Sequence, residues 1–114
     1  MSDPSTLHLT AANFDHEVRE SPVPVLVDFS ANWCQPCRAL GPTIDVLAEE
    51  YVGRVKIGKV DVDTNPDLAN EYSVQSIPTV LLIVDGKVTG RFVGIQSKDE
   101  LAHALDQVIG PAAA

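Results

Sequence analysis

A nearly uninterrupted apolar run, Val-Pro-Val-Leu-Val-Asp-Phe at residues 23–29, constrains the fold of this chain more than any other stretch. A strand with one exposed face alternates apolar and polar side chains, because successive side chains point to opposite faces of the sheet. A run without that alternation is typical of a central strand that is covered on both faces. We therefore expect a layered protein with a sheet at its centre.

Strand-like runs alternate along the chain with segments of helical periodicity. The expected strands are residues 7–9, 23–29, 54–63, 78–84 and 87–95, and the expected helices are residues 10–20, 34–52, 66–72 and 97–109. Asp85-Gly86 is a hairpin signal, so the last two strands form an antiparallel pair, whereas helices connect the earlier strands in parallel. The sequence thus predicts an α/β fold with a central mixed five-stranded sheet flanked by four helices.

Three of the expected helices begin at residues that commonly cap helices. Thr10 precedes the first helix, and Asn65 precedes the third. Ser97 and Glu100 have the spacing of a capping box at the start of the fourth helix.

Length and charge exclude several classes of protein. The 114 residues fit one domain, 1–114, in which we expect residues 110–114 to form a frayed tail. A net charge of −8 disfavours nucleic acid and anionic membranes as partners, because phosphate binding needs clustered Lys and Arg. The sequence has no signal-peptide pattern and no apolar run near the ~18 residues of a membrane span. We therefore expect a cytoplasmic protein.

The only two cysteines, Cys34 and Cys37, follow the buried strand and open the second helix, with Gln35 and Pro36 between them. At this spacing the two sulfurs can meet within one helical turn. Unpaired N–H groups and the helix dipole stabilise a thiolate at the first cysteine, which we expect to be exposed. Lowered thiol pKa values are typical of redox-active cysteines in this setting.

Two other interpretations of the cysteine pair are a zinc site and two inert core thiols. Structural zinc usually needs four ligands, and His8, His16 and His103 lie far apart without ligand spacing. An exposed strand-to-helix junction argues against inert thiols. Redox chemistry without a metal is therefore the favoured hypothesis.

Several motifs in order resemble the thioredoxin family along nearly the whole chain. They are Trp33-Cys34-Gln35-Pro36-Cys37 after VLVDF, KVDVDTNP at 59–66, SIPTVLLI at 76–83 and GRFVG at 90–94. The resemblance implies the thioredoxin fold and a protein disulfide reductase, in which Cys34 attacks a substrate disulfide and Cys37 resolves the mixed disulfide.

The resemblance also implies partners and cofactors. The chain itself would bind no cofactor, and an FAD-containing thioredoxin reductase would reduce it again with electrons from NADPH. Its substrates would be disulfide-containing proteins, such as reductases and peroxidases, and it would act as a monomer.

Asp28 resembles the buried carboxylate of the family, and its place in an apolar strand supports that role independently. Burial raises the pKa of a carboxyl group, and an acid that ionises near neutral pH can accept a proton from Cys37. A satisfied structural acid is the alternative. Lys59 matches the family's lysine near that carboxylate, although on sequence alone it is equally a solvated strand residue. Trp33 would provide a flat apolar surface beside the disulfide.

Ile77-Pro78 resembles the loop with a cis proline that faces the cysteines in this family. An ordinary trans proline at a strand start is the alternative, since most X-Pro bonds are trans. Gly94 would let a substrate backbone approach closely, or it is a simple strand-end glycine. We assign Trp33, Pro36, Ile77, Pro78 and Gly94 to substrate binding.

Departures from the family pattern bear on the redox potential and on partner choice. Gln35 replaces a glycine between the cysteines, and Ser30 stands where a further tryptophan is common. Gln35 and Pro36 are therefore expected to tune the potential. Two alternative functions stay open, namely a disulfide oxidase or isomerase on the same fold, and a redox-silent binding subunit of a larger assembly.

Overall fold

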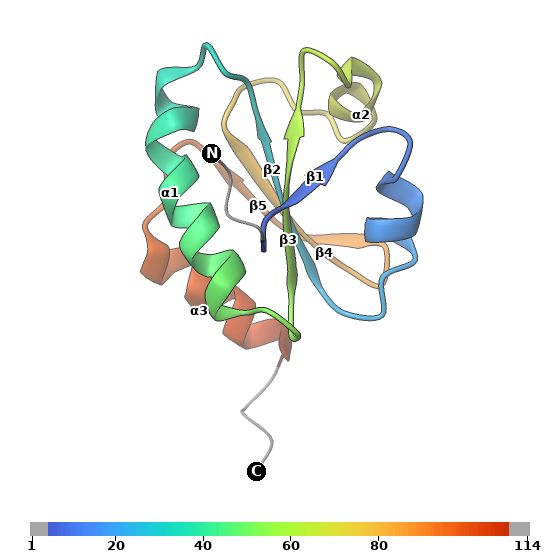
Figure 1. Cartoon of the computed structure of the whole chain (residues 1–114), viewed down its shortest axis with the longest axis vertical. Helices are drawn as coiled ribbons and strands as arrows, with labels where there is room; N and C mark the ends of the chain where they lie inside the picture. The colour runs from blue at the N-terminus through green and yellow to red at the C-terminus, as the bar shows by residue number, and fades with distance from the viewer. Residues whose placement is uncertain (1–4, 110–114) are drawn as a thin grey trace.

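The computed structural model describes residues 5–109, in which five strands form one sheet (Figure 1). The elements are β1 (Leu7–Leu9), the short π-helix η1 (Asp15–Arg19), β2 (Val25–Ser30), α1 (Gln35–Glu50), β3 (Lys56–Asp61), α2 (Pro66–Glu71), β4 (Thr79–Val84), β5 (Lys87–Val93) and α3 (Lys98–Ile109). The strand order is β1-β3-β2-β4-β5; β3 pairs in parallel with β1 and β2, and β4 pairs antiparallel with β2 and β5. The predicted mixed five-stranded sheet and its four helices are confirmed. The expected frayed tail, 110–114, lies outside the described residues.

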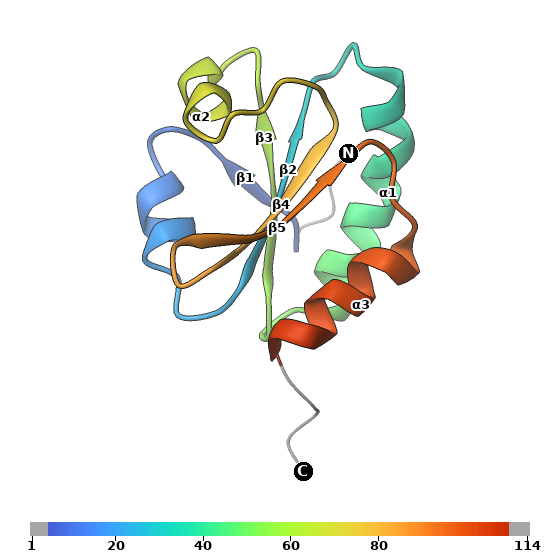
Figure 2. The same cartoon turned by 180° about the vertical axis from the view of Figure 1, so that it is seen from behind.

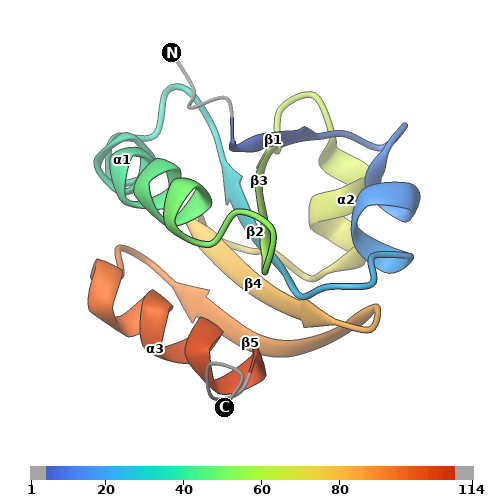
Figure 3. The same ribbon diagram turned by 60° about the horizontal axis from the view of Figure 1, so that its bottom comes forward.

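Helices cover both faces of the sheet, as the apolar run at 23–29 predicts. Figure 3 shows α1 and α3 on one side of the sheet and α2 with the short helix η1 on the other, and Figure 2 shows the same arrangement from behind. Leu26 packs with α1 and α3, whereas its neighbours Val25 and Val27 pack with η1 and α2. All three are fully buried, which explains why β2 carries no polar face.

The sheet brings two distant loops together. Because β2 and β4 are antiparallel and Phe29 is the partner of Thr79, the end of β2 lies beside the start of β4. The loop from β2 to α1 and the loop before β4 therefore meet at one edge of the sheet.

The β4–β5 hairpin confirms the turn predicted at Asp85-Gly86. Asp85 has φ 52° and Gly86 has φ 78°. Positive φ at both central residues is the conformation that a two-residue hairpin loop requires, and Asp-Gly is a preferred pair for it.

The first helix is much shorter than the predicted 10–20, and Thr10 is not its cap. The Asn13 side chain accepts a hydrogen bond from the Thr10 N–H at 2.8 Å and donates one to the His8 carbonyl at 2.9 Å. An Asn side chain that binds nearby backbone offers an alternative to helix. As a result, residues 11–13 form turns, and only Asp15–Arg19 continue as a π-helix.

The other two predicted caps have different outcomes. The third helix does begin after Asn65, but that side chain makes no capping bond and accepts the Ala11 N–H at 2.9 Å. The capping box at the start of α3 is confirmed, since the Glu100 N–H donates to the Ser97 hydroxyl and the Ser97 N–H donates to the Glu100 carboxylate, both at 3.1 Å.

No helix among residues 5–109 is long and apolar enough to cross a membrane.

Candidate redox site

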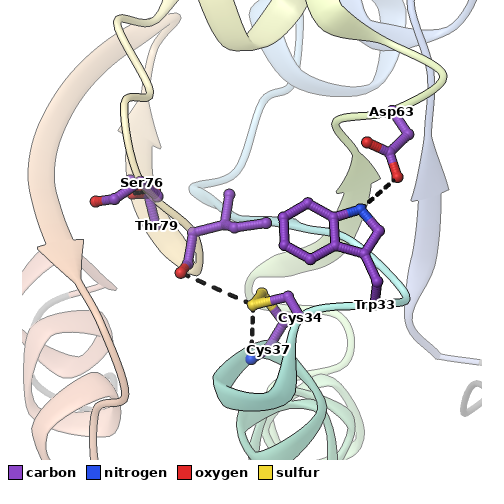
Figure 4. Close-up of a disulfide and its surroundings, with 7 residues drawn as sticks. Trp33, Cys34, Cys37, Asp63, Ser76 and Thr79 are labelled. Atoms are coloured by element: carbon purple, nitrogen blue, oxygen red, sulfur yellow. Dashed lines mark hydrogen bonds between the residues drawn. A yellow bond between two sulfur atoms is a disulfide. The ribbon is translucent and has the colours of Figure 1, made fainter.

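Cys34 and Cys37 form a disulfide at the start of α1, with their Cα atoms 5.2 Å apart (Figure 4). Cys34 is the N-cap residue, and its Sγ accepts a hydrogen bond from the Cys37 backbone N–H at 3.3 Å. The helix start therefore stabilises negative charge on the Cys34 sulfur, as the position of the pair predicts. Gln35 and Pro36 occupy the first two helical positions and are exposed.

One expectation about the cysteines is wrong, because Cys34 is not the exposed member of the pair. In the disulfide, Cys34 is 5% exposed and Cys37 is 4% exposed. Both cysteines pack with Ala31, Val62 and Ile77 in a small apolar cluster. Packing at the strand-to-helix junction covers both cysteines. They therefore differ in the groups that surround them and not in how much of each is exposed.

Asp28 lies on β2 and is 1% exposed. Burial raises the pKa of this carboxyl from 3.8 to about 7, the charge on Asp45 adds to the rise, and the cation on Lys59 opposes it. The Asp28 Oδ1 atom is buried without a hydrogen-bond partner among residues 5–109. The expected rise in pKa is confirmed, and an unpartnered buried oxygen is typical of a reactive acid more than of a satisfied structural one.

A cavity of about 570 Å³ connects the buried acid with the disulfide. Asp28, Cys37, Lys59 and Asp45 line it, together with residues of the β2–α1 loop and the first turns of α1. Cys37 therefore faces the same polar space as Asp28. Cys34, by contrast, has its Sγ 3.8 Å from the Ile77 carbonyl oxygen.

Lys59 is the direct cross-strand partner of Asp28 in the parallel β2–β3 pair. Its side chain is 21% exposed, and its ammonium forms an ion pair with Asp45 Oδ1 at 3.2 Å. The structure thus places Lys59 among the residues that line the polar cavity, where it pairs with Asp45.

Ile77-Pro78 is a cis peptide bond, as the resemblance implies. The Pro78 carbonyl accepts the Gly94 N–H at 2.9 Å, which ties the loop before β4 to the end of β5. Gly94 has φ 89°, a conformation that L side chains rarely adopt, so the backbone itself requires glycine here. Space around Gly94 is open, since a Cβ atom there would meet no atom within 4 Å.

Trp33 precedes the disulfide and is 69% exposed, although it is a large apolar residue. Its indole N–H donates to Asp63 Oδ2 at 2.8 Å, so the ring is held in place while its surface remains open (Figure 4). The sequence prediction missed Asp63 as a partner of Trp33. Its position in DVDTNPD, after β3 and beside the cysteine loop at the carboxyl ends of the parallel strands, was the available signal.

A second carboxylate of this segment has a structural role. Asp61 uses its carboxylate to accept the Asp63 N–H at 2.9 Å, which is a local turn contact. Within residues 5–109, no cluster of three or more His, Cys, Asp or Glu side chains is arranged to hold a metal ion.

Comparisons with known proteins agree with this geometry. The thioredoxin family model matches residues 5–107. The chain is 46% identical to "Thioredoxin" of Chlorobaculum thiosulfatiphilum over 101 residues, which cover 89% of this chain and 94% of that protein. It is 46% identical to "Thioredoxin 1" of Synechococcus elongatus, covering 87% and 92%. It is 45% identical to "Thioredoxin, mitochondrial" of Mus musculus, covering 86% and 59%.

A disulfide between closely spaced cysteines at a helix start defines the redox centre, and the matches extend over nearly all of the described chain. The protein is accordingly a thiol–disulfide oxidoreductase of the protein-disulfide reductase type, with a redox-active Cys34–Cys37 disulfide. The chain belongs to the thioredoxin family.

Proposed function

We propose that Cys34 is the nucleophile, that Cys37 resolves the mixed disulfide, and that Asp28 accepts the proton of Cys37. The observation that carries this assignment is the cavity that Asp28 and Cys37 line together, while Cys34 lies outside it as the helix N-cap. The Cys34 sulfur accepts a backbone N–H, which stabilises its thiolate. Cys37 lies beside an acid whose pKa is about 7, which suits a proton acceptor at neutral pH.

The reaction consists of two exchanges. The Cys34 thiolate attacks one sulfur of a substrate disulfide, and the other substrate sulfur leaves as a thiolate that takes a proton from water. Cys37 then transfers its proton to Asp28 and attacks the Cys34 sulfur, which releases the second substrate thiolate. The substrate gains two electrons, and the Cys34–Cys37 dithiol becomes the disulfide. Lys59 tunes the acceptor through its charge.

The proposed substrate surface surrounds the sulfurs. Trp33 and Pro36 contribute from the cysteine side, and Ile77, Pro78 and Gly94 contribute from the facing loop and the end of β5. Exposed apolar area at Trp33 and open space at Gly94 support this assignment. A substrate peptide could bind between the Trp33 ring and the loop before β4.

The proposed partners are disulfide-containing proteins, such as reductases and peroxidases, and a thioredoxin reductase that restores the dithiol with FAD and NADPH. Family membership supports the general class of partner. We further propose that the protein acts as a cytoplasmic monomer without a bound cofactor.

A reductase-coupled insulin assay tests the proposed function. We expect NADPH oxidation and insulin precipitation with the wild-type protein, thioredoxin reductase and NADPH, and neither with Cys34→Ser under the same conditions. A redox-silent binding subunit would show no insulin reduction. An oxidase or isomerase would equilibrate with glutathione at a much less reducing potential than a thioredoxin.

Gln35 and Pro36 lead to a prediction about the reduction potential. Pro36 has no N–H, so one donor is missing in the first turn next to the Cys34 sulfur. The thiolate is then stabilised only moderately, which favours the disulfide and makes the dithiol a good reductant. Gln35 keeps its N–H and is exposed, so its replacement by glycine mainly changes helix propensity by a few tenths of a kcal/mol.

We therefore expect Gln35→Gly to change the potential by no more than ~15 mV, because 30 mV corresponds to about 1.4 kcal/mol for this couple. Pro36→His should shift the potential further, toward the oxidising side, because it restores an N–H and adds a possible cation. Equilibration of all three proteins with glutathione at one pH measures both shifts. A larger effect of Gln35→Gly would mean that the Gln35 side chain acts on the sulfur directly.

A further inference from the structure

The ion pair between Asp45 and Lys59 has no role in the chemistry described so far. Asp45 lies on α1, Lys59 lies on β3, and both line the cavity that contains Asp28 and Cys37. Their side chains are 24% and 21% exposed, so the pair is largely shielded from solvent. Shielded charges interact more strongly than surface pairs, which makes their arrangement important for a nearby acid.

The position of the Lys59 ammonium is the central observation. Lys59 is the cross-strand neighbour of Asp28, and it is a cation that could pair with that carboxylate. Within residues 5–109, however, its ion pair is with Asp45, and Asp28 Oδ1 is buried without a partner. A Cβ atom added to Gly41 would lie 3.7 Å from the Lys59 Nζ, so the ammonium rests against the surface of α1.

Asp45 is itself fixed from a second direction. The Thr6 hydroxyl donates to Asp45 Oδ1 at 2.8 Å, and the same oxygen accepts the ammonium of Lys59 at 3.2 Å. Thr6 is 4% exposed and precedes β1, so α1, β3 and the segment before β1 meet at this oxygen. Two donors on one oxygen hold the carboxylate, and through it the ammonium, in one place.

We propose that Asp45 is a positioning residue of the redox centre, whose ion pair holds the Lys59 ammonium on α1 and away from the Asp28 carboxylate. The inference deepens the proposed function, because its chemical consequence rests on the role of Asp28 as proton acceptor. An acid paired closely with a lysine would remain ionised and would be a weak base for the Cys37 thiol. Held apart from the cation, Asp28 keeps its affinity for a proton.

The titratable groups around Asp28 agree with this assignment. His8 on β1, Lys59 and Asp61 on β3, and Arg38 and Asp45 on α1 line the cavity with it. Of these, Lys59 and Asp45 act on the Asp28 pKa, with opposite signs. Asp45 thus acts in two ways, as a like charge near Asp28 and as the anchor of the opposing cation.

The first experiment measures the pKa of Asp28 by carboxyl NMR in the oxidised protein, where neither cysteine titrates. Asp45→Asn keeps an oxygen for the Thr6 hydroxyl but removes the charge that holds Lys59. We expect the pKa of Asp28 to fall below that of the wild type. Glu50→Gln is the matched control, because Glu50 is also on α1 and pairs with a lysine, Lys98, at 2.8 Å, but it does not line the cavity. It should leave the pKa of Asp28 unchanged.

A double-mutant cycle with Lys59→Gln separates anchoring from charge alone. Asp45→Asn should lower the pKa of Asp28 less in the Lys59→Gln background than in the wild type, because only the like charge is then removed. An unchanged or raised pKa in Asp45→Asn would overturn the inference. So would an equal fall in both backgrounds, because Asp45 would then act without holding Lys59.

Kinetics of mixed-disulfide resolution provide the second readout. With Asp45→Asn, we expect the rate to begin its rise at a lower pH, so that resolution at pH 6 becomes about twofold faster. The plateau rate above pH 8 should fall about twofold, because an acid with a lower pKa is a weaker base. A fall in the Asp28 pKa that depends on Lys59 supports the inference, whether or not the rate of mixed-disulfide resolution changes. If that fall occurred without any change in the rate profile, the proton-acceptor role of Asp28 would be rejected, and the anchoring of Lys59 by Asp45 would stand.

Discussion

Cys37→Ser should accumulate covalent complexes with target proteins, whereas Cys34→Ser should trap almost none. In the first variant, Cys34 still attacks as a thiolate at the helix N-cap, and the mixed disulfide cannot be resolved. In the second, the remaining thiol lies in the first helical turn and faces the cavity beside Asp28, whereas the N-cap sulfur that accepts a backbone N–H has been removed. We expect the amounts trapped to differ by at least about tenfold, since only the thiolate is an effective nucleophile.

Non-reducing electrophoresis of each variant after incubation with oxidised insulin measures this difference. A Cys34→Ser/Cys37→Ser double variant controls for non-covalent association. Equal trapping by the two single variants would show that the order of attack is wrong. The measurement is informative because exposure alone does not separate the two cysteines.

Asp28→Asn should stabilise the oxidised protein at pH 8 and have a much smaller effect at pH 4. The pKa of Asp28 rises from 3.8 to about 7 on folding, so the folded state holds its proton more tightly than the unfolded state does. This contribution to stability is fully present below the unfolded pKa and is lost as pH rises through about 7. Asparagine is neutral at every pH and avoids that loss.

The expected size of the effect follows from the same shift. At 1.36 kcal/mol for each tenfold change, the variant gains up to about 4 kcal/mol relative to the wild type between pH 4 and pH 8. Comparing the difference in unfolding free energy at the two pH values cancels the cost of burying the amide group, because that cost does not depend on pH. Urea unfolding of both proteins at each pH measures the difference, with Asp99→Asn on the exposed start of α3 as the control. A difference that does not depend on pH would contradict the raised pKa.

Much of the framework follows from the sequence because local patterns dominate there. The apolar run of β2, the Asp85-Gly86 turn and the Ser97/Glu100 capping box each depend on neighbouring residues, and each is confirmed. A lone acid in an apolar strand also predicts burial and a raised pKa from local sequence, as Asp28 shows.

Other features depend on competing side-chain contacts, some of them local and some between residues that are far apart in the chain. Asn13 shortens the first helix because its side chain binds nearby backbone, and Asn65 binds Ala11 instead of capping α2. Helical periodicity and cap preferences do not include such competing partners.

The electrostatic details of the site are of the same kind. The Trp33 indole N–H donates to Asp63, which follows it by 30 residues in the chain. Lys59 forms its ion pair with Asp45 instead of with its cross-strand neighbour Asp28. The partner with which a long charged side chain pairs depends on how α1 packs against the sheet. No local sequence pattern specifies that packing.

The most direct test of the account is the rate at which a preformed mixed disulfide on Cys34 is resolved, measured against pH in the wild type and in Asp28→Asn. Rapid mixing and acid quenching, followed by mass spectrometry, give this rate without contributions from substrate binding or the reductase. If Asp28 accepts the proton of Cys37, the wild-type rate rises with an inflection near pH 7, and the inflection disappears in Asp28→Asn together with most of the rate at neutral pH. The same inflection and the same neutral rate in both proteins would contradict the role of Asp28.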